Sequence, residues 1–252
     1  KITDDVDLLM IVHPFGLSDE SKYAIDQYVL RGGKAIVFVD PHPEEGARSN
    51  RALRLPAGLG SHLPNLFKAW GLKFDRDKVL GDLKAGQRVQ AGVDSFGRPI
   101  ITRYVAWTSY GPENLNTEDV TLAQLRLLNF GTPGYLEVEK DATTTVTPLI
   151  TSTEASGPFD ANSVRRNPQP AEILREFKPQ NKTYILAARV TGKAKTAFPD
   201  GLPKEDKKKD DKDAKDEAEK IKPKPHISES TEALNLIVVA DTDFIADLFW
   251  LQ

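Results

Sequence analysis

Apolar and polar residues alternate in blocks over the N-terminal part of the chain, in a pattern typical of a strand, a helix and a second strand. Residues 6–12 and 35–39 are almost continuous apolar runs, as expected for strands that are buried on both faces. Between them, Ser18 can cap a helix on which Ile25 and Val29 share one apolar face. Because the connection is short and helical, we expect the two strands to be adjacent and parallel.

This opening unit predicts an α/β fold, built on a mostly parallel, doubly wound sheet of the flavodoxin-like type. Residues 234–240 are predicted to form another buried strand. Between residues 89 and 150 several β-rich stretches alternate with turns, which predicts strand-rich decoration that can form a subdomain. At 252 residues the chain is long for one domain but not clearly two, and we expect a single α/β domain over residues 1–252.

Residues 204–225 differ from the rest of the chain in composition. They contain nine lysines and eight acidic residues, and Ile221 is their only sizeable apolar residue. A segment of this kind cannot offset its ordering entropy by burial, so we expect a solvated, mobile insertion. Its two signs of charge nearly balance, which argues against a polybasic membrane anchor.

Five segments in order along the chain carry a resemblance to a known protein family. They are DQYVLRGGKAIVFVDP (26–41), LPNLFKAWGLKFDRDKVLGD (63–82), VTPLITSTEAS (146–156), TYILAARVTGKAKTAFPDG (183–201) and LIVVADTDFIADLFW (236–250). Together they resemble the extracytoplasmic domain of the ABC-transporter auxiliary family typified by the gliding-motility protein GldG. The resemblance implies a fold related to class I glutamine amidotransferases and a membrane-anchored parent protein. It also implies a periplasmic location at the inner membrane, and the permease and ATPase subunits of an ABC transporter as partners.

Both ends of the chain look like cuts in a longer protein. The chain begins without methionine at the edge of a strand, and it stops inside an apparent helix. No run approaches the roughly 20 apolar residues that a membrane helix needs. The family resemblance places the expected membrane helices outside both ends.

Composition excludes several kinds of chemistry. The chain has no cysteine, which rules out disulfides, cysteine-based zinc sites and the cysteine nucleophile of amidotransferases. A serine nucleophile on a sharp strand-to-helix turn would favour G-x-S-x-G, and this pattern does not occur. A net charge of −3 gives no reason to expect nucleic acid as a partner.

Five polar residues follow the predicted parallel strands. His13 follows the first strand, Asp40 and His42 follow the second, and Asp241 and Asp243 follow the last. Because such strands deliver their carboxyl ends to one edge of a sheet, these residues are candidate ligand-binding positions. Imidazole and carboxylate groups also suit zinc and other divalent metals. The favoured interpretation is that the aspartates brace loop backbones, so we expect no metal and no other cofactor.

The sequence therefore predicts a non-enzymatic extracytoplasmic domain of an ABC-transporter auxiliary subunit, which contacts partners or recognises a ligand. Two alternatives remain. One is a soluble ligand-binding module that uses the crevice near Asp40 and Asp241. The other is a metal-dependent, hydrolase-like domain at the same edge, where a metal-bound water would be the nucleophile.

Overall fold

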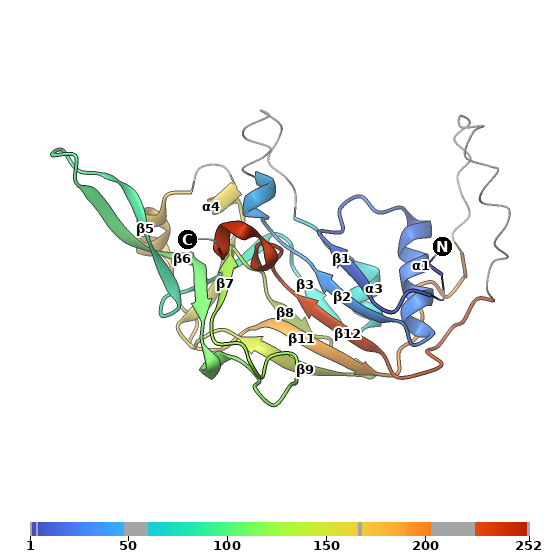
Figure 1. The fold of residues 1–252 in the computed structure, drawn as a ribbon. Coiled ribbons are helices and arrows are strands. Elements are labelled where there is room, and N and C mark those ends of the chain that lie inside the picture. Colours follow the sequence, from blue (N-terminus) through green and yellow to red (C-terminus); the bar gives the residue numbers. More distant parts are fainter. Residues whose placement is uncertain (1, 4, 48–59, 166–167, 203–224, 251–252) are drawn as a thin grey trace, which may run out of the picture.

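The computed structural model describes residues 2–3, 5–47, 60–165, 168–202 and 225–250. Its largest sheet has seven strands, six of them in the order β1-β2-β12-β11-β8-β3, and the seventh, β9, pairs with β11 (Figure 1). These strands are β1 (Leu9–Val12), β2 (Lys34–Phe38), β3 (Leu72–Phe74), β8 (Leu136–Val138), β9 (Thr144–Thr151), β11 (Ile185–Gly192) and β12 (Asn235–Val239). The predicted insertion at 204–225 lies outside the described residues except for Pro225.

Two smaller antiparallel sheets lie beside the main sheet. One pairs β4 (Lys78–Asp82) with β10 (Ser156–Asp160), and the other joins β5 (Gly86–Val93), β6 (Pro99–Tyr110) and β7 (Leu128–Gly131). The hairpin of β5 and β6 extends away from the rest of the molecule (Figure 1). The helices are α1 (Asp19–Leu30), α3 (Pro64–Ala69), α4 (Asn162–Arg165) and α5 (Pro170–Glu176), with 3-10 turns η1 (Pro112–Asn114), η2 (Asp243–Ile245) and η3 (Asp247–Phe249).

The N-terminal strand–helix–strand unit is as the sequence predicts. β1 and β2 are adjacent and parallel. The Ser18 side chain caps α1 by accepting a hydrogen bond from the Ser21 N–H (3.2 Å). The helix ends at Leu30, and Gly32 shortly after it has a φ of +90°, the left-handed conformation that favours glycine. Ile25 and Val29 are buried against the sheet. β12 adds to the other side of β2, also parallel, so the strand predicted at 234–240 is confirmed.

The predicted mostly parallel, doubly wound sheet of flavodoxin-like or amidotransferase-like type is wrong. Among the described strands only two of nine pairings are parallel, β1 with β2 and β2 with β12. β11 runs antiparallel to β12, and the strands beyond it continue in the antiparallel sense. The physical reason is that the antiparallel neighbours in the main sheet are far apart along the chain, so their directions depend on tertiary contacts that no local pattern predicts. A helical crossover makes neighbouring strands parallel, and the sequence shows one between β1 and β2, which are joined through α1.

The two faces of the main sheet are covered by different kinds of structure. Helices α1 and α3 pack on one face, where Val37, Leu66 and Leu236 belong to one buried cluster. On the other face, Phe38 of β2 packs in a cluster with Phe130 of β7, which belongs to the three-stranded sheet. Strands and turns therefore replace the second layer of helices that a doubly wound fold would have.

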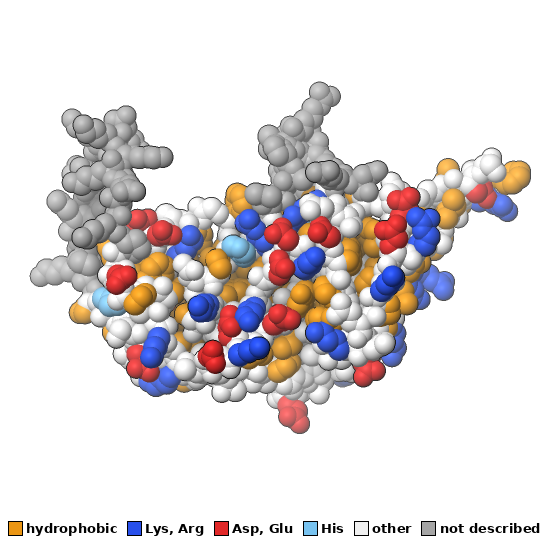
Figure 2. Space-filling view, turned by 180° about the vertical axis from the view of Figure 1, so that it is seen from behind, with side chains coloured by type: hydrophobic (Ala, Val, Ile, Leu, Met, Phe, Trp, Pro, Cys, Tyr) orange, Lys and Arg blue, Asp and Glu red, His pale blue; other side chains and the backbone are white. Residues whose placement is uncertain are grey.

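The strand-rich stretch predicted at 89–150 contributes to more than one sheet. β5, β6 and β7 form a sheet of their own, whereas β8 and β9 belong to the main sheet. The single domain and the subdomain both stay predictions. On the face drawn in Figure 2, lysine, arginine and acidic side chains are intermixed, as expected for a net charge of −3.

Leu236 tests the packing of the main sheet. Its side chain, on β12, is fully buried in the cluster that includes residues of α1 and β2, so Leu236→Ala should lower the free energy of unfolding by about 2–5 kcal/mol, measured by urea titration. Leu127→Ala is the matched control, because Leu127 is half exposed and its truncation should cost less than about 0.5 kcal/mol. Equal losses in both variants would contradict the assigned core.

Candidate functional site

Three aspartates lie together at the carboxyl ends of β2 and β12. Asp40 follows β2, Asp241 follows β12, and Asp243 is the first residue of η2. The exposed fractions of the three residues are 0%, 0% and 1%, respectively. One carboxylate oxygen from each lies within 4.8 Å of the others. The structure thus brings three of the five candidate residues together, because parallel strands deliver their carboxyl ends to one side.

Asp40 joins the ends of β2 and β12. Its Oδ2 accepts hydrogen bonds from the backbone N–H (2.7 Å) and the hydroxyl (2.5 Å) of Thr242. Its Oδ1 accepts one from the backbone N–H of His42 (2.6 Å). The Asp40 carboxylate therefore organises the turn that follows each of two neighbouring strands.

Asp241 and Asp243 reach further, to segments distant in sequence. Asp241 Oδ2 accepts a hydrogen bond from the backbone N–H of Gly131 in β7 (2.9 Å), and Oδ1 accepts one from Phe244 (2.6 Å). Asp243 accepts hydrogen bonds from the backbone N–H groups of Glu44 (2.6 Å) and Glu45 (3.2 Å). Each of the six oxygens in the cluster thus has a backbone donor, as the loop-bracing interpretation predicts.

Burial raises the pKa of all three carboxyl groups, and nearby negative charges add to the shift. For Asp40 the largest cause is burial, followed by the charge of Asp243. For Asp241 it is burial, followed by the charge of Asp40. Burial also raises the pKa of Asp243 to about 7. The backbone donors favour the ionised forms but do not offset burial. The cluster therefore holds protons at a pH where exposed aspartates are ionised.

The two candidate histidines do not add imidazole ligands to this cluster. Among the described residues, the group with metal-ligand spacing contains the three aspartates and neither histidine. His42 is buried, and it contacts the cluster through its backbone N–H, which donates a hydrogen bond to Asp40. His13 follows β1, stacks on Phe15 with ring centroids 6.2 Å apart, and burial lowers its pKa. The ligand-binding role assigned to all five residues stays a prediction.

The aspartates could hold a divalent cation only by sharing their oxygens with backbone donors. Carboxylate oxygens suit Mg²⁺ and Zn²⁺, and each oxygen keeps a second lone pair when it accepts one hydrogen bond. The three side chains are nevertheless buried and already bonded to loops. As arranged, this cluster is better suited to bracing loops than to activating a water molecule.

Sequence reasoning missed the residues that close this edge of the sheet. Gly131 is tightly enclosed. A Cβ at this position would collide with the ring of Phe249 and would lie 3.0 Å from the Cβ of Asp243. Thr132 has a φ of +52°, an uncommon conformation for a β-branched residue, and its hydroxyl donates to the carbonyl of His42 (2.8 Å). The buried Glu44 carboxylate accepts a hydrogen bond from Trp107 Nε1 (3.0 Å). No local motif marks these residues, because they come from different sheets.

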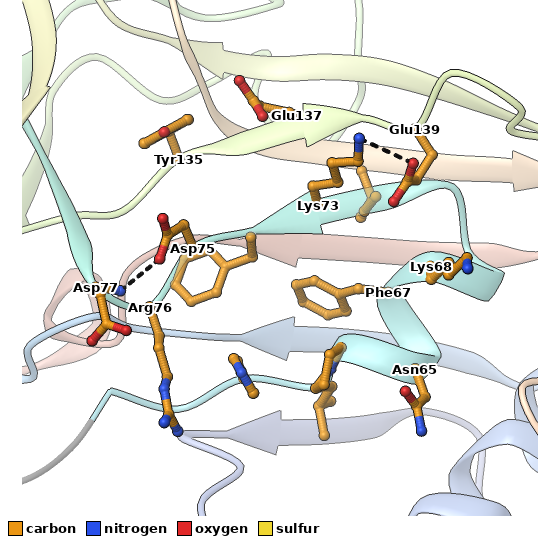
Figure 3. Close-up of a pocket in the computed structure, with 15 residues that line it drawn as sticks. Asn65, Phe67, Lys68, Lys73, Asp75, Arg76, Asp77, Tyr135, Glu137 and Glu139 are labelled. Carbon is orange, nitrogen blue, oxygen red and sulfur yellow. Dashed lines mark hydrogen bonds and ion pairs between the residues drawn. The ribbon is translucent and has the colours of Figure 1, made fainter.

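A groove of about 630 Å³ lies elsewhere, beside α3, β3 and β8 (Figure 3). The aromatic rings of Phe67 and Phe74, with centroids 6.3 Å apart, form part of its apolar lining. Lys73 on β3 pairs with Glu139 across the groove lining (3.2 Å). The groove therefore combines an apolar wall with charged side chains.

Two acidic side chains lie near Tyr135 in one part of this groove. Burial raises the pKa of Tyr135 to about 12, and the charges of Glu137 and Asp75 add to the shift. Tyr135 is therefore a neutral phenol that can donate a hydrogen bond. This part of the groove thus combines an apolar wall, a hydrogen-bond donor and side chains of both charges.

Comparison with known protein families identifies the family to which the chain belongs. The family described as an ABC-type uncharacterized transport system matches residues 1–252. The chain belongs to this family. As a member of the transport-system family, it is an auxiliary component of an ABC-type transport system. The family resemblance of the sequence is confirmed at this level, and the narrower likeness to GldG stays an expectation.

Other comparisons of this family member found no relative. Neither the curated proteins nor the solved structures contain a match to the chain. Within the described ranges, no helix has the length and apolar character needed to span a membrane.

The raised pKa of Asp243 predicts a pH-dependent stability. Since the folded pKa of about 7 exceeds the unfolded value, the contribution of Asp243 to stability is fully present below about pH 4 and is lost as the pH rises through about 7. Between about pH 5 and about pH 7, Asp243 alone should lower the free energy of unfolding by up to about 1.4 kcal/mol per pH unit, and Asp40 and Asp241, whose pKa values are also raised, add to the fall. Urea titrations at several pH values measure this slope.

Two substitutions separate Asp243 from other titrating groups. Asp243→Asn cannot ionise, so it should reduce the fall in stability with pH. Asp247→Asn alters an exposed neighbour in η3 and should leave the slope unchanged. A slope that survives Asp243→Asn in full would contradict the assignment.

Proposed function

We propose that the chain is a non-enzymatic, extracytoplasmic part of an auxiliary subunit that works with the permease and ATPase of an ABC transporter. The observation that carries this proposal is the family match over residues 1–252. The site geometry supports it, because the edge where a doubly wound enzyme would bind its substrate is closed by buried, backbone-bonded aspartates. A periplasmic location and a membrane anchor outside the chain belong to the same proposal.

The hairpin of β5 and β6 is the element best suited to contact the permease. It extends from the body of the molecule (Figure 1) and carries apolar side chains that are exposed at and near its turn. These residues are Val93, Phe96, Ile100 and Ile101. Phe96 is 81% exposed, and Arg98 lies over its ring at 5.3 Å. Exposed apolar groups on a projecting arm are typical of surfaces that bind another protein.

Phe96→Ser tests this contact in the full-length protein. We expect a tagged wild-type protein, purified from solubilised membranes, to retain a multi-spanning permease and its ATPase, identified by mass spectrometry. Phe96→Ser should lower the recovery of both about fivefold or more, the effect of losing roughly 1 kcal/mol of binding. The matched control is Val120→Ser, because Val120 is 86% exposed but lies outside the hairpin.

The two variants also separate the proposal from its alternatives. Equal recovery of the permease with Phe96→Ser and with Val120→Ser would refute the hairpin as the contact. Recovery of no transporter subunit with the wild-type protein would refute the proposed partnership itself.

A metal-dependent, hydrolase-like role is the second candidate, favoured by the 4.8 Å spacing of Asp40, Asp241 and Asp243. Since the backbone donors already use these oxygens, we expect isothermal titration with Mg²⁺ or Zn²⁺ to show no micromolar binding at this cluster. Micromolar binding that is abolished by Asp40→Ala, with Asp247→Ala as the control, would support the metal-dependent role instead.

A further inference from the structure

The two ends of the main sheet are protected very differently. At one end, β3 is only three residues long and carries the charged Lys73. At the other end, β1 has the sequence Leu-Met-Ile-Val, with no charge and no proline. Natural sheets usually protect an edge strand with charged residues, proline or short length, because unpaired backbone groups attract further strands. β1 has neither charged residues nor proline to protect its edge.

The backbone of β1 presents hydrogen-bonding groups on its outer side. The His13 N–H donates to the Phe38 carbonyl in β2 (3.0 Å), so the backbone groups of alternate residues point toward β2. Those of Leu8, Met10 and Val12 therefore point away from it, to a side where no described strand pairs.

The same three residues expose their side chains. Leu8, Met10 and Val12 are 50%, 56% and 44% exposed, on the face of β1 opposite the buried Ile11. Apolar stripes of this kind on a strand edge mark a protein contact or an aggregation site. The outer edge of β1 thus has both backbone groups that no described strand pairs and a stripe of exposed apolar side chains.

We infer that β1 pairs with β1 of a second copy of this chain, antiparallel and across a two-fold axis, so that two main sheets form one continuous sheet. The register places Met10 opposite Met10 of the other copy and Leu8 opposite Val12. Each stripe then meets an identical stripe, the self-complementarity that a two-fold interface requires.

Charge also favours this arrangement over a parallel one. Asp7 precedes β1 and His13 follows it, so antiparallel pairing places the Asp7 carboxylate of each copy near the His13 imidazole of the other. Parallel pairing would place Asp7 beside Asp7, where like charges repel. The inference concerns contacts between copies and does not rest on the proposed transporter partnership.

The absence of cysteine from the chain permits a sharp test. Directly opposed residues in a hydrogen-bonded antiparallel pair have Cα atoms about 5.5 Å apart, within disulfide range. Met10→Cys should therefore form a disulfide-linked dimer under mild oxidation. Leu8→Cys should not link to itself, because two such residues would be roughly 13 Å apart. An equal mixture of Leu8→Cys and Val12→Cys chains should cross-link, and the remote Val120→Cys should not.

Sedimentation of the cysteine-free chain provides the second measurement. We expect a concentration-dependent dimer that Met10→Lys converts to a monomer, whereas Val120→Lys leaves it unchanged. Circular dichroism checks that both variants fold. We expect them to fold, because the side chains of Met10 and Val120 are exposed. A chain that stays monomeric at about millimolar concentration overturns the inference. So does a dimer that survives Met10→Lys, or a dimer in which Met10→Cys fails to cross-link.

Discussion

The buried carboxylate cluster is the interaction on which the arrangement of the molecule depends. Asp40 joins the turns after β2 and β12, Asp241 holds β7 against the main sheet, and Asp243 holds the turn at Glu44 and Glu45. Burying three carboxyl groups is costly unless protons and hydrogen bonds compensate. Here backbone N–H donors and raised pKa values provide that compensation, and segments far apart in sequence are thereby connected at a single point.

This cluster also occupies the edge of the sheet where open parallel sheets have their ligand crevice. In open parallel sheets, ligands bind outside the carboxyl ends of the strands. In this chain the same space is filled by β7, by the residues after β2 and by η2. Fold and function can separate in this way, because a site depends on particular side chains and their access rather than on the strand order.

The surfaces available for recognition lie away from that crevice. The projecting β5–β6 hairpin, the groove beside β3 and the apolar edge of β1 are at different places on the fold. A continuous sheet formed through β1 would present two hairpins related by the same two-fold axis, which would allow one assembly to bind two partner surfaces.

The sequence by itself determined the local structure that depends on short-range patterns. Apolar runs, the Ser18 cap and the glycine after α1 identified two parallel strands and their helix, and a buried strand at 234–240, because burial and capping act within a few residues. It also identified Asp40, Asp241 and Asp243 as residues of one edge. Only the tertiary structure decided the antiparallel half of the sheet and the closing of that edge by Gly131 and Thr132. Strand pairing and burial of this kind depend on contacts between segments distant in sequence, and no local pattern encodes which segments will meet.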